Sequence, residues 1–181
     1  MKAGADARII GITGWSGSGK TTLIIKLLPE LVALGLRVAT LKHAHHDFDV
    51  DLPGKDSYEH RKAGASEVIV ASSRRWAQMH ELGEEGEASL SALLRRLSPC
   101  DLVLIEGYKR EHHPKIEIYR QIVGKPLRQP DDPTIVAIAS DVPVPEATVD
   151  VIDLDDVNAV AAAIVEKAKP FDTVLDILEK T

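Results

Sequence analysis

The chain has 181 residues, of which 44% are hydrophobic, 28% charged and 4% aromatic, and its formal net charge is −6 at pH 7. This composition is typical of a soluble α/β domain with a sizeable core, and the negative charge argues against nucleic-acid binding, which needs a positive surface field. The single cysteine, Cys100, excludes an internal disulfide framework, and the absence of a signal pattern or a membrane-length apolar run predicts a cytoplasmic protein with no membrane segment.

The first elements along the chain alternate between strand and helix. Arg8–Thr13 is nearly all apolar, as a strand buried on both faces should be. Thr21–Leu34 predicts a helix that ends at Gly35 and is kinked by Pro29. Arg37–Leu41 predicts a second apolar strand.

The polar stretch Lys42–Asp56 that follows is predicted to be a loop. It is longer than ordinary connections, which favours a functional role. After it the pattern predicts a short helix, two strands and an amphipathic helix, over Ser57–Ala63, Glu67–Ala71, Trp76–His80 and Ala88–Leu97.

Four more strands are predicted in the second half of the chain, at Asp101–Ile105, Lys115–Ile122, Thr134–Ala139 and Val149–Leu154. Polarity alternates along Lys115–Ile122, so we expect this strand to be more exposed and to be a candidate dimer surface. Val123–Pro133 holds three prolines and is predicted to be loop. Asp155 or Asp156 can cap a helix over Val157–Lys169, and a short terminal helix begins at Pro170.

This alternation predicts an α/β fold: a P-loop NTPase with a mostly parallel, twisted sheet and helices on both faces. We expect a single nucleotide-binding domain over residues 1–181, with residues 170–181 as a C-terminal helical extension. Ligands of such sheets bind at the carboxyl ends of the strands. Residues that follow the strands are therefore the candidates for function.

The segment after the first strand reads Gly-Trp-Ser-Gly-Ser-Gly-Lys-Thr and fits the phosphate-binding pattern G-x-x-x-x-G-K-[ST]. Lys20 should reach the β and γ phosphates, Thr21 should bind Mg²⁺, and Thr22 is a candidate α-phosphate contact. The alternative is a glycine-rich turn without a ligand. The predicted nucleotide-binding residues of this loop are Gly14, Trp15, Ser16, Gly17, Ser18, Gly19, Lys20, Thr21 and Thr22.

Leu102–Glu106 is an apolar strand that ends in an acid, a pattern of the second nucleotide-binding signature, although many buried strands end in this way. Glu106 is therefore the candidate catalytic acid, near Mg²⁺ or the attacking water. Asp141 follows a later strand, and its carboxylate can accept from both the N1 and N2 hydrogens of guanine, which would select GTP. The alternative for Asp141 is a turn-forming role before Val142 and Pro143.

The stretch His43–Asp51 is dense in residues that bind metals, and three interpretations stay open. One of its acids contacts the Mg²⁺ of a triphosphate; its histidines hold a transition metal; or the loop is merely solvated. The acids alternate, so only a subset can face one site. They are Asp47, Asp49 and Asp51, and the histidines are His43, His45 and His46.

Three segments resemble the MobB family, the adaptor proteins of molybdopterin-guanine dinucleotide biosynthesis: Lys42–Ala65, Ile105–Lys109 and Ala137–Pro143. The resemblance covers about residues 8 to 165. It implies GTP and Mg²⁺ as ligands, a weak GTPase activity, a cytoplasmic homodimer, and assistance to MobA, the guanylyltransferase that joins GMP to molybdopterin. Further partners that it implies are molybdopterin itself or molybdoenzymes.

Carried onto this sequence, the resemblance implies that Gly14–Thr22 binds the phosphates and Asp141 the guanine. Thr21, Glu106 and one of Asp47 or Asp49 would be the residues on the Mg²⁺ side. What Trp15 contributes is not implied.

Two other functions remain as alternatives. A small-molecule or nucleotide kinase shares the phosphate loop but usually needs an arginine-rich lid, and neither Arg74–Arg75 nor Arg95–Arg96 lies in an evident lid. A metal-delivery GTPase would use the histidines after the second strand, but paired cysteines are absent. No obvious glutamine or arginine finger is found, which favours slow hydrolysis.

Overall fold

The computed structural model describes residues 7–44 and 48–180. The chain forms two compact units: residues 1–43 with 90–181, here called the sheet unit, and residues 44–89, here called the hairpin unit. The sequence predicts a single domain over residues 1–181, and its patterns do not mark the boundaries of the hairpin unit.

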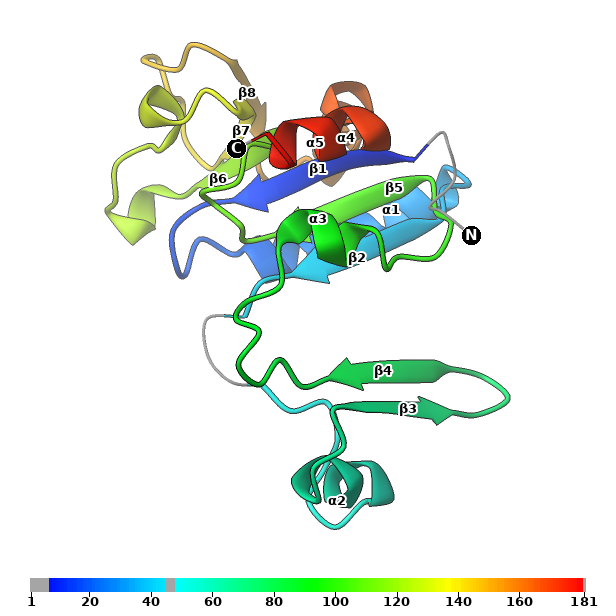
Figure 1. Cartoon of the computed structure of the whole chain (residues 1–181). Helices are drawn as coiled ribbons and strands as arrows, with labels where there is room; N and C mark the ends of the chain where they lie inside the picture. The colour runs from blue at the N-terminus through cyan, green and yellow to red at the C-terminus, as the bar shows by residue number, and fades with distance from the viewer. Residues whose placement is uncertain (1–6, 45–47, 181) are drawn as a thin grey trace. The chain divides into compact units, whose positions relative to one another are not determined.

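The sheet unit is built on parallel strands in the order β2-β5-β1-β6-β7-β8, to which the short β9 adds an antiparallel pairing with β1 (Figure 1). This confirms the predicted mostly parallel α/β sheet. The strands are β1 (Arg8–Thr13), β2 (Val38–Lys42), β5 (Leu102–Glu106), β6 (Lys115–Tyr119), β7 (Ile135–Ser140), β8 (Asp150–Asp153) and β9 (Lys169–Pro170).

Helices cover both faces of this sheet, because neighbouring residues of the buried strands point to opposite sides. Ile10 of β1 and Leu104 of β5 pack with α1 and α4, whereas Ile9 and Val103 pack with α3 and α5. Each strand thus contributes to two cores. The helices are α1 (Lys20–Ala33), α3 (Leu90–Leu94), α4 (Val157–Lys167) and α5 (Phe171–Leu178).

Most helix boundaries agree with the sequence prediction. α1 continues through Pro29, and Asp156 caps α4 by accepting a hydrogen bond from the amide of Ala159 at 2.9 Å. α3 is shorter than the predicted Ala88–Leu97 helix. Within the described residues, no helix combines the length and apolar character needed to cross a membrane.

The prediction of an exposed strand at Lys115–Ile122 is wrong. β6 is an interior strand between β1 and β7, and Lys115 and Glu117 are buried in it. Lys115 Nζ contacts Asp132 and Thr134 at 3.1 and 2.6 Å, and Glu117 accepts backbone hydrogen bonds from the following segment. That segment contains the short 3-10 helices η1 (Gln121–Val123) and η2 (Gln129–Asp131), so the polar alternation reflects partners within the fold rather than solvent.

The hairpin unit contains the antiparallel strands β3 (Glu67–Ala71) and β4 (Trp76–His80) together with α2 (Asp56–Lys62) (Figure 1). Arg61 is its polar centre, with ion pairs to Asp49, Asp51 and Glu81 at 2.8, 2.5 and 2.7 Å. The hydrogen bonds that Arg61 donates to these three carboxylates raise its pKa, and those to Asp51 raise it most. Arg61 therefore links residues before α2 with the residue that follows β4.

Candidate functional site

The carboxyl ends of the parallel strands in the sheet unit lie at one edge, as the direction of the ladder requires. The glycine-rich loop follows β1 there, and the side chains at or just after the ends of β2, β5, β6 and β7 are Lys42, Glu106, Arg120 and Asp141. The loop, Glu106 and Asp141 are predicted from the sequence as site residues, whereas Lys42 and Arg120 are not.

The loop after β1 has the backbone that only glycine adopts readily. Gly14 has a φ of 143°, and a Cβ there would lie 2.7 Å from both Ser18 Oγ and the carbonyl oxygen of Ile118. Gly19 has a φ of 91° and forms the N-terminus of α1. Left-handed glycines next to a helix start turn successive amide groups toward one point, which suits an anion.

The side chain of Lys20 forms hydrogen bonds back to the start of the loop. Its Nζ donates to the carbonyl oxygens of Gly14 and Trp15 at 3.0 and 2.9 Å. Burial lowers the pKa of Lys20; Glu106 opposes this, while Lys42, among other cations, adds to the lowering. Positive charge is thus concentrated at this edge, although the chain as a whole is negative.

Thr21, Glu106 and Lys42 form a cluster beside the loop. Thr21 Oγ1 donates to Glu106 Oε1 at 2.8 Å, and Lys42 Nζ lies 3.3 Å from both oxygens. A hydroxyl next to a carboxylate is a set of hard oxygen ligands of the kind that Mg²⁺ prefers. The cluster thus brings together two of the predicted Mg²⁺-side residues, and their role with the metal stays a prediction.

Arg120 connects the loop to the predicted base-reading acid. Its Nε donates to the carbonyl oxygen of Ser18 at 3.2 Å, and its Nη1 lies 3.8 Å from Asp141 Oδ2. Asp141 Oδ1 also accepts from the backbone amide of Gln121 at 3.0 Å. No motif marks Arg120, because its contacts come from segments far apart in the sequence.

The other loop residues are placed more simply. Ser18 is buried, and its Oγ has no hydrogen-bond partner among the described residues. Ser16, Gly17 and Thr22 are exposed. Trp15 donates its indole N–H to the carbonyl oxygen of Pro126 at 2.8 Å. Among the residues expected to contact phosphate, the exposed ones have polar groups that a ligand can reach.

The segment after β2 is only partly described. The rings of His43 and Tyr108 are in contact, with centroids 4.8 Å apart and planes tilted by 39°. Tyr108 has a φ of 46°, which is rare for a residue other than glycine. His45, His46 and Asp47 lie outside the described residues. Their predicted roles as metal ligands therefore have no structural account.

Asp49 belongs to the hairpin unit and pairs with Arg61 Nη2 at 2.8 Å. The neighbouring Asp51 bonds to the same guanidinium, which is the main reason why its pKa is lowered. The contact of Asp49 with Mg²⁺ stays a prediction. Over residues 7–44 and 48–180, no three histidines, cysteines or acids form a group able to hold a metal.

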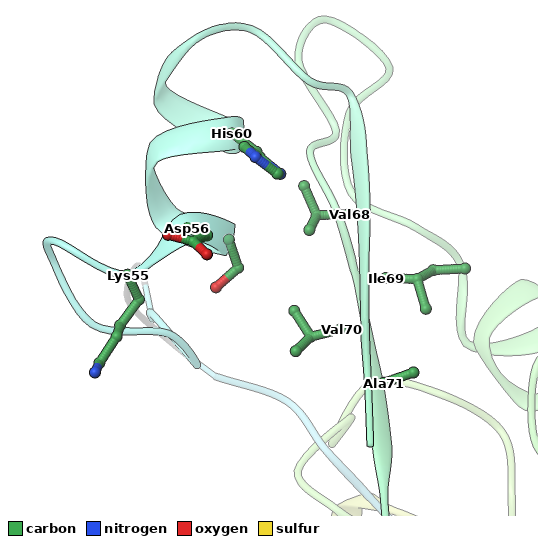
Figure 2. Close-up of a pocket in the computed structure, with 8 residues that line it drawn as sticks. Lys55, Asp56, His60, Val68, Ile69, Val70 and Ala71 are labelled. Atoms are coloured by element: carbon green, nitrogen blue, oxygen red, sulfur yellow. The ribbon is translucent and has the colours of Figure 1, made fainter. Parts of the chain in front are cut away.

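A pocket in the hairpin unit lies between α2 and β3 (Figure 2). Val68 and Val70 of β3 point toward α2, which carries Asp56 and His60. Ile69 points to the other side of the strand. Its walls are mainly apolar and hold no glycine-rich loop. The pocket therefore shares no residue with the glycine-rich loop of the sheet unit, and its lining differs in chemistry.

A family model described as "MobB: Molybdopterin guanine dinucleotide synthesis protein B" matches residues 9–141. This range includes the glycine-rich loop after β1, Glu106 and Asp141. It also includes the whole hairpin unit, so that unit is part of the matched sequence.

Curated relatives and a solved structure agree with this match. The chain is 47% identical over 161 residues to the molybdopterin-guanine dinucleotide biosynthesis adapter protein of Escherichia coli (strain K12), covering 87% of this chain and 91% of that protein. It is 46% identical over 135 residues to the protein of the same name from Haemophilus influenzae, covering 75% of each. A crystal structure of molybdopterin-guanine biosynthesis protein B matches with a TM-score of 0.70 and 30% identity, covering 87% of this chain and 98% of that one.

Proposed function

The chain belongs to the family of molybdopterin guanine dinucleotide synthesis protein B, and from this premise we propose that it is an adapter of molybdopterin guanine dinucleotide biosynthesis that binds GTP with Mg²⁺. The observation that carries the proposal is the edge of the sheet unit. There the glycine-rich loop, Lys20 and the Thr21–Glu106 hydrogen bond of 2.8 Å converge at the ends of adjacent parallel strands.

The chemistry of these residues suits a triphosphate. The amides of the loop and the N-terminus of α1 would bind the phosphate oxygens, and Lys20 would contribute a point charge toward the β and γ phosphates. Thr21 and Glu106 would hold Mg²⁺, Thr21 directly and Glu106 directly or through water. Bound Mg²⁺ would neutralise charge that develops on the phosphates.

Asp141 is the residue we assign to guanine. Its carboxylate has Oδ1 on the amide of Gln121 and Oδ2 near Arg120. Each carboxylate oxygen has two lone pairs, so both can still accept from the N1 and N2 hydrogens of guanine. The backbone hydrogen bond would orient the carboxylate for this purpose.

We assign hydrolysis a minor part in this function. Glu106 is the candidate group for positioning water, and its oxygen Oε1 is shared with Thr21 and Lys42. An acid engaged in this way is better suited to hold a metal than to remove a proton quickly. The nucleotide would then report to or supply a partner, for which we propose the guanylyltransferase that joins GMP to molybdopterin.

Self-association is part of the proposal and rests on the hairpin unit. Large apolar side chains are exposed on it, including Ile69 at 61% and Trp76 at 62%. Exposed apolar surface of this kind commonly marks an interaction site. We propose a homodimer formed through this unit, in the cytoplasm, where the single Cys100 stays reduced.

Titration calorimetry of the full chain with GTP and with ATP, each in the presence of Mg²⁺, tests the proposal. We expect saturable binding with GTP preferred, and a smaller preference in Asp141→Asn. Tighter binding of ATP would contradict the base assignment. The adapter role is tested by adding the protein to the purified guanylyltransferase with GTP and molybdopterin, where we expect more dinucleotide product than with the enzyme alone.

A further inference from the structure

Trp15 is an indole inside the phosphate loop, and neither the loop pattern nor the proposed function gives it a role. Its N–H donates to the carbonyl oxygen of Pro126 at 2.8 Å. Two cations lie over its ring: the guanidinium carbon of Arg128 at 5.3 Å from the centroid and Nζ of Lys125 at 6.0 Å. The indole therefore joins the loop to the segment that follows β6.

The backbone of Arg128 is fixed independently of its side chain. The buried carboxylate of Glu117 accepts the amide of Arg128 at 2.9 and 3.1 Å and the amide of Gln129 at 2.9 Å. Glu117 lies in β6, opposite Thr13 at the end of β1. Strand, carboxylate and segment thus place Arg128 close to where the phosphate loop begins.

The guanidinium of Arg128 keeps hydrogen-bonding capacity. Its Nε is buried and has no partner among residues 7–44 and 48–180. A buried donor without a partner is costly, and a guanidinium offers a planar fork that matches phosphate oxygens. Over residues 7–44 and 48–180, no carboxylate forms an ion pair with this guanidinium, although Glu117 accepts from the backbone amide of Arg128.

Arg128 and Arg120 serve opposite ends of the loop. Arg120 contacts Ser18 and Asp141, the proposed base-reading end. Arg128 lies over Trp15, whose carbonyl oxygen accepts from Lys20, the residue that reaches the β and γ phosphates. The positive charge of Arg128 also helps to lower the pKa of Lys20, after burial and the charges of Lys42 and Lys109.

We propose that Arg128, held in place by the Trp15 ring, binds the terminal phosphate of the nucleotide and makes the protein prefer a nucleoside triphosphate to a diphosphate. This rests on the proposed function. The cations gathered at this end repel one another, so a group with more negative charge binds better there. Trp15 acts as the positioning residue, since it supplies the surface on which the guanidinium lies.

The test follows nucleotide binding through the fluorescence of Trp15 itself. The chain has two tryptophans, and Trp76 is exposed in the hairpin unit, so Trp76→Phe leaves Trp15 as the single indole. In this background, Mg²⁺ with GDP and Mg²⁺ with the nonhydrolysable analogue GMPPNP are titrated against Arg128→Ala, Arg128→Lys and Lys125→Ala. Binding is followed by Trp15 fluorescence and by calorimetry, and circular dichroism checks the fold.

We expect Arg128→Ala to weaken GMPPNP about tenfold or more and GDP no more than about threefold, because a hydrogen-bonded charge is lost only from the terminal phosphate. Arg128→Lys keeps the charge and should be intermediate, and Lys125→Ala should leave the ratio of the two affinities unchanged. If Arg128→Ala and Arg128→Lys both keep the wild-type ratio, the inference is wrong while the proposed function stands. A wild-type chain that binds neither nucleotide overturns the proposed function and this inference with it.

Discussion

The sheet unit and the hairpin unit satisfy their apolar residues in opposite ways. The sheet unit has two cores, one on each face of its strands. In the described part of the hairpin unit, Val68 is the one buried hydrophobic side chain, while Phe48, Ile69 and Trp76 are all more than 60% exposed. A two-stranded hairpin with little burial is only marginally stable alone. The difference shows that the sheet unit buries its own apolar residues while the hairpin unit leaves most of its large ones exposed, and from this we infer a partner surface on the hairpin unit.

The two units also differ in net charge. Residues 44–89 contain ten acidic and five basic residues, so they account for −5 of the total charge of −6. The sheet unit is thus close to neutral, and the cations around Lys20 are not outweighed by its own acids. We infer a division of labour in which the sheet unit binds the polyanion and the hairpin unit makes protein contacts.

The largest expected effect concerns core packing. Leu27→Ala removes a fully buried side chain between α1 and the sheet, and we expect it to lower the free energy of unfolding by about 2–5 kcal/mol. Ile69→Ala in the hairpin unit should change the free energy of unfolding of the dissociated chain by no more than about 0.5 kcal/mol, because Ile69 is 61% exposed there. Urea unfolding of both variants measures the difference, and equal losses would break the comparison.

We also expect a loss of stability at low pH that arises in the sheet unit. His113 is fully buried, and burial lowers its pKa to about 3. Below the ordinary histidine pKa of about 6.5, His113 binds a proton in the unfolded chain but stays neutral in the folded chain. The free energy of unfolding therefore falls as the pH falls from about 6.5 toward 3.

The contribution of His113 to this slope is at most about 1.4 kcal/mol per pH unit. The measurement is urea unfolding at pH 7, 6, 5 and 4 for the wild type and for His113→Met, which keeps the volume and cannot titrate. We expect the variant to show a shallower loss of stability with acid. Parallel curves would mean that His113 takes up its proton in the folded chain as readily as in the unfolded chain.

Association should depend on the hairpin unit. Ile69→Asp places a charge on its exposed apolar surface, and we expect the dissociation constant of the dimer to rise at least about tenfold, or ~1.4 kcal/mol. Sedimentation equilibrium measures this, and Ile122→Asp, at a site 90% exposed in the sheet unit, is the matched control. A dimer weakened only by the Ile122 variant would assign the interface to the other unit.

The smallest expected effect is a change in local opening within the hairpin unit. Arg61→Ala removes the partner of Asp49, Asp51 and Glu81. Like charges that lose their common cation repel, so amide hydrogen exchange in α2 should become faster. Exchange in β5 of the sheet unit should stay as in the wild type. Faster exchange in both units would show that they do not behave as separate cooperative regions.

What could be predicted from the sequence was encoded in contiguous residues. The bounds of β1, β3 and β4 match the prediction, and so does the order of a glycine-rich loop after β1, a strand ending in Glu106 and a strand followed by Asp141. Periodicity and turn residues carry this information locally.

The misses have a common physical cause. Lys115 and Glu117 alternate with apolar residues like the solvent face of a strand, but their partners lie 11 to 19 residues further on. The contacts of Arg120 span 102 residues to Ser18. The missing core of the hairpin unit is a property of tertiary packing, which a pattern of single residues does not reveal.

The central claim is that the loop at the start of α1 binds a nucleoside triphosphate, and calorimetric titration of Mg²⁺ and GTP into the full chain tests it most directly. We expect saturable binding in the wild type and in Lys26→Ala, an exposed lysine of the same helix, and none in a folded Lys20→Ala variant. Undiminished binding in Lys20→Ala, or no heat of binding in the wild type, would contradict the account.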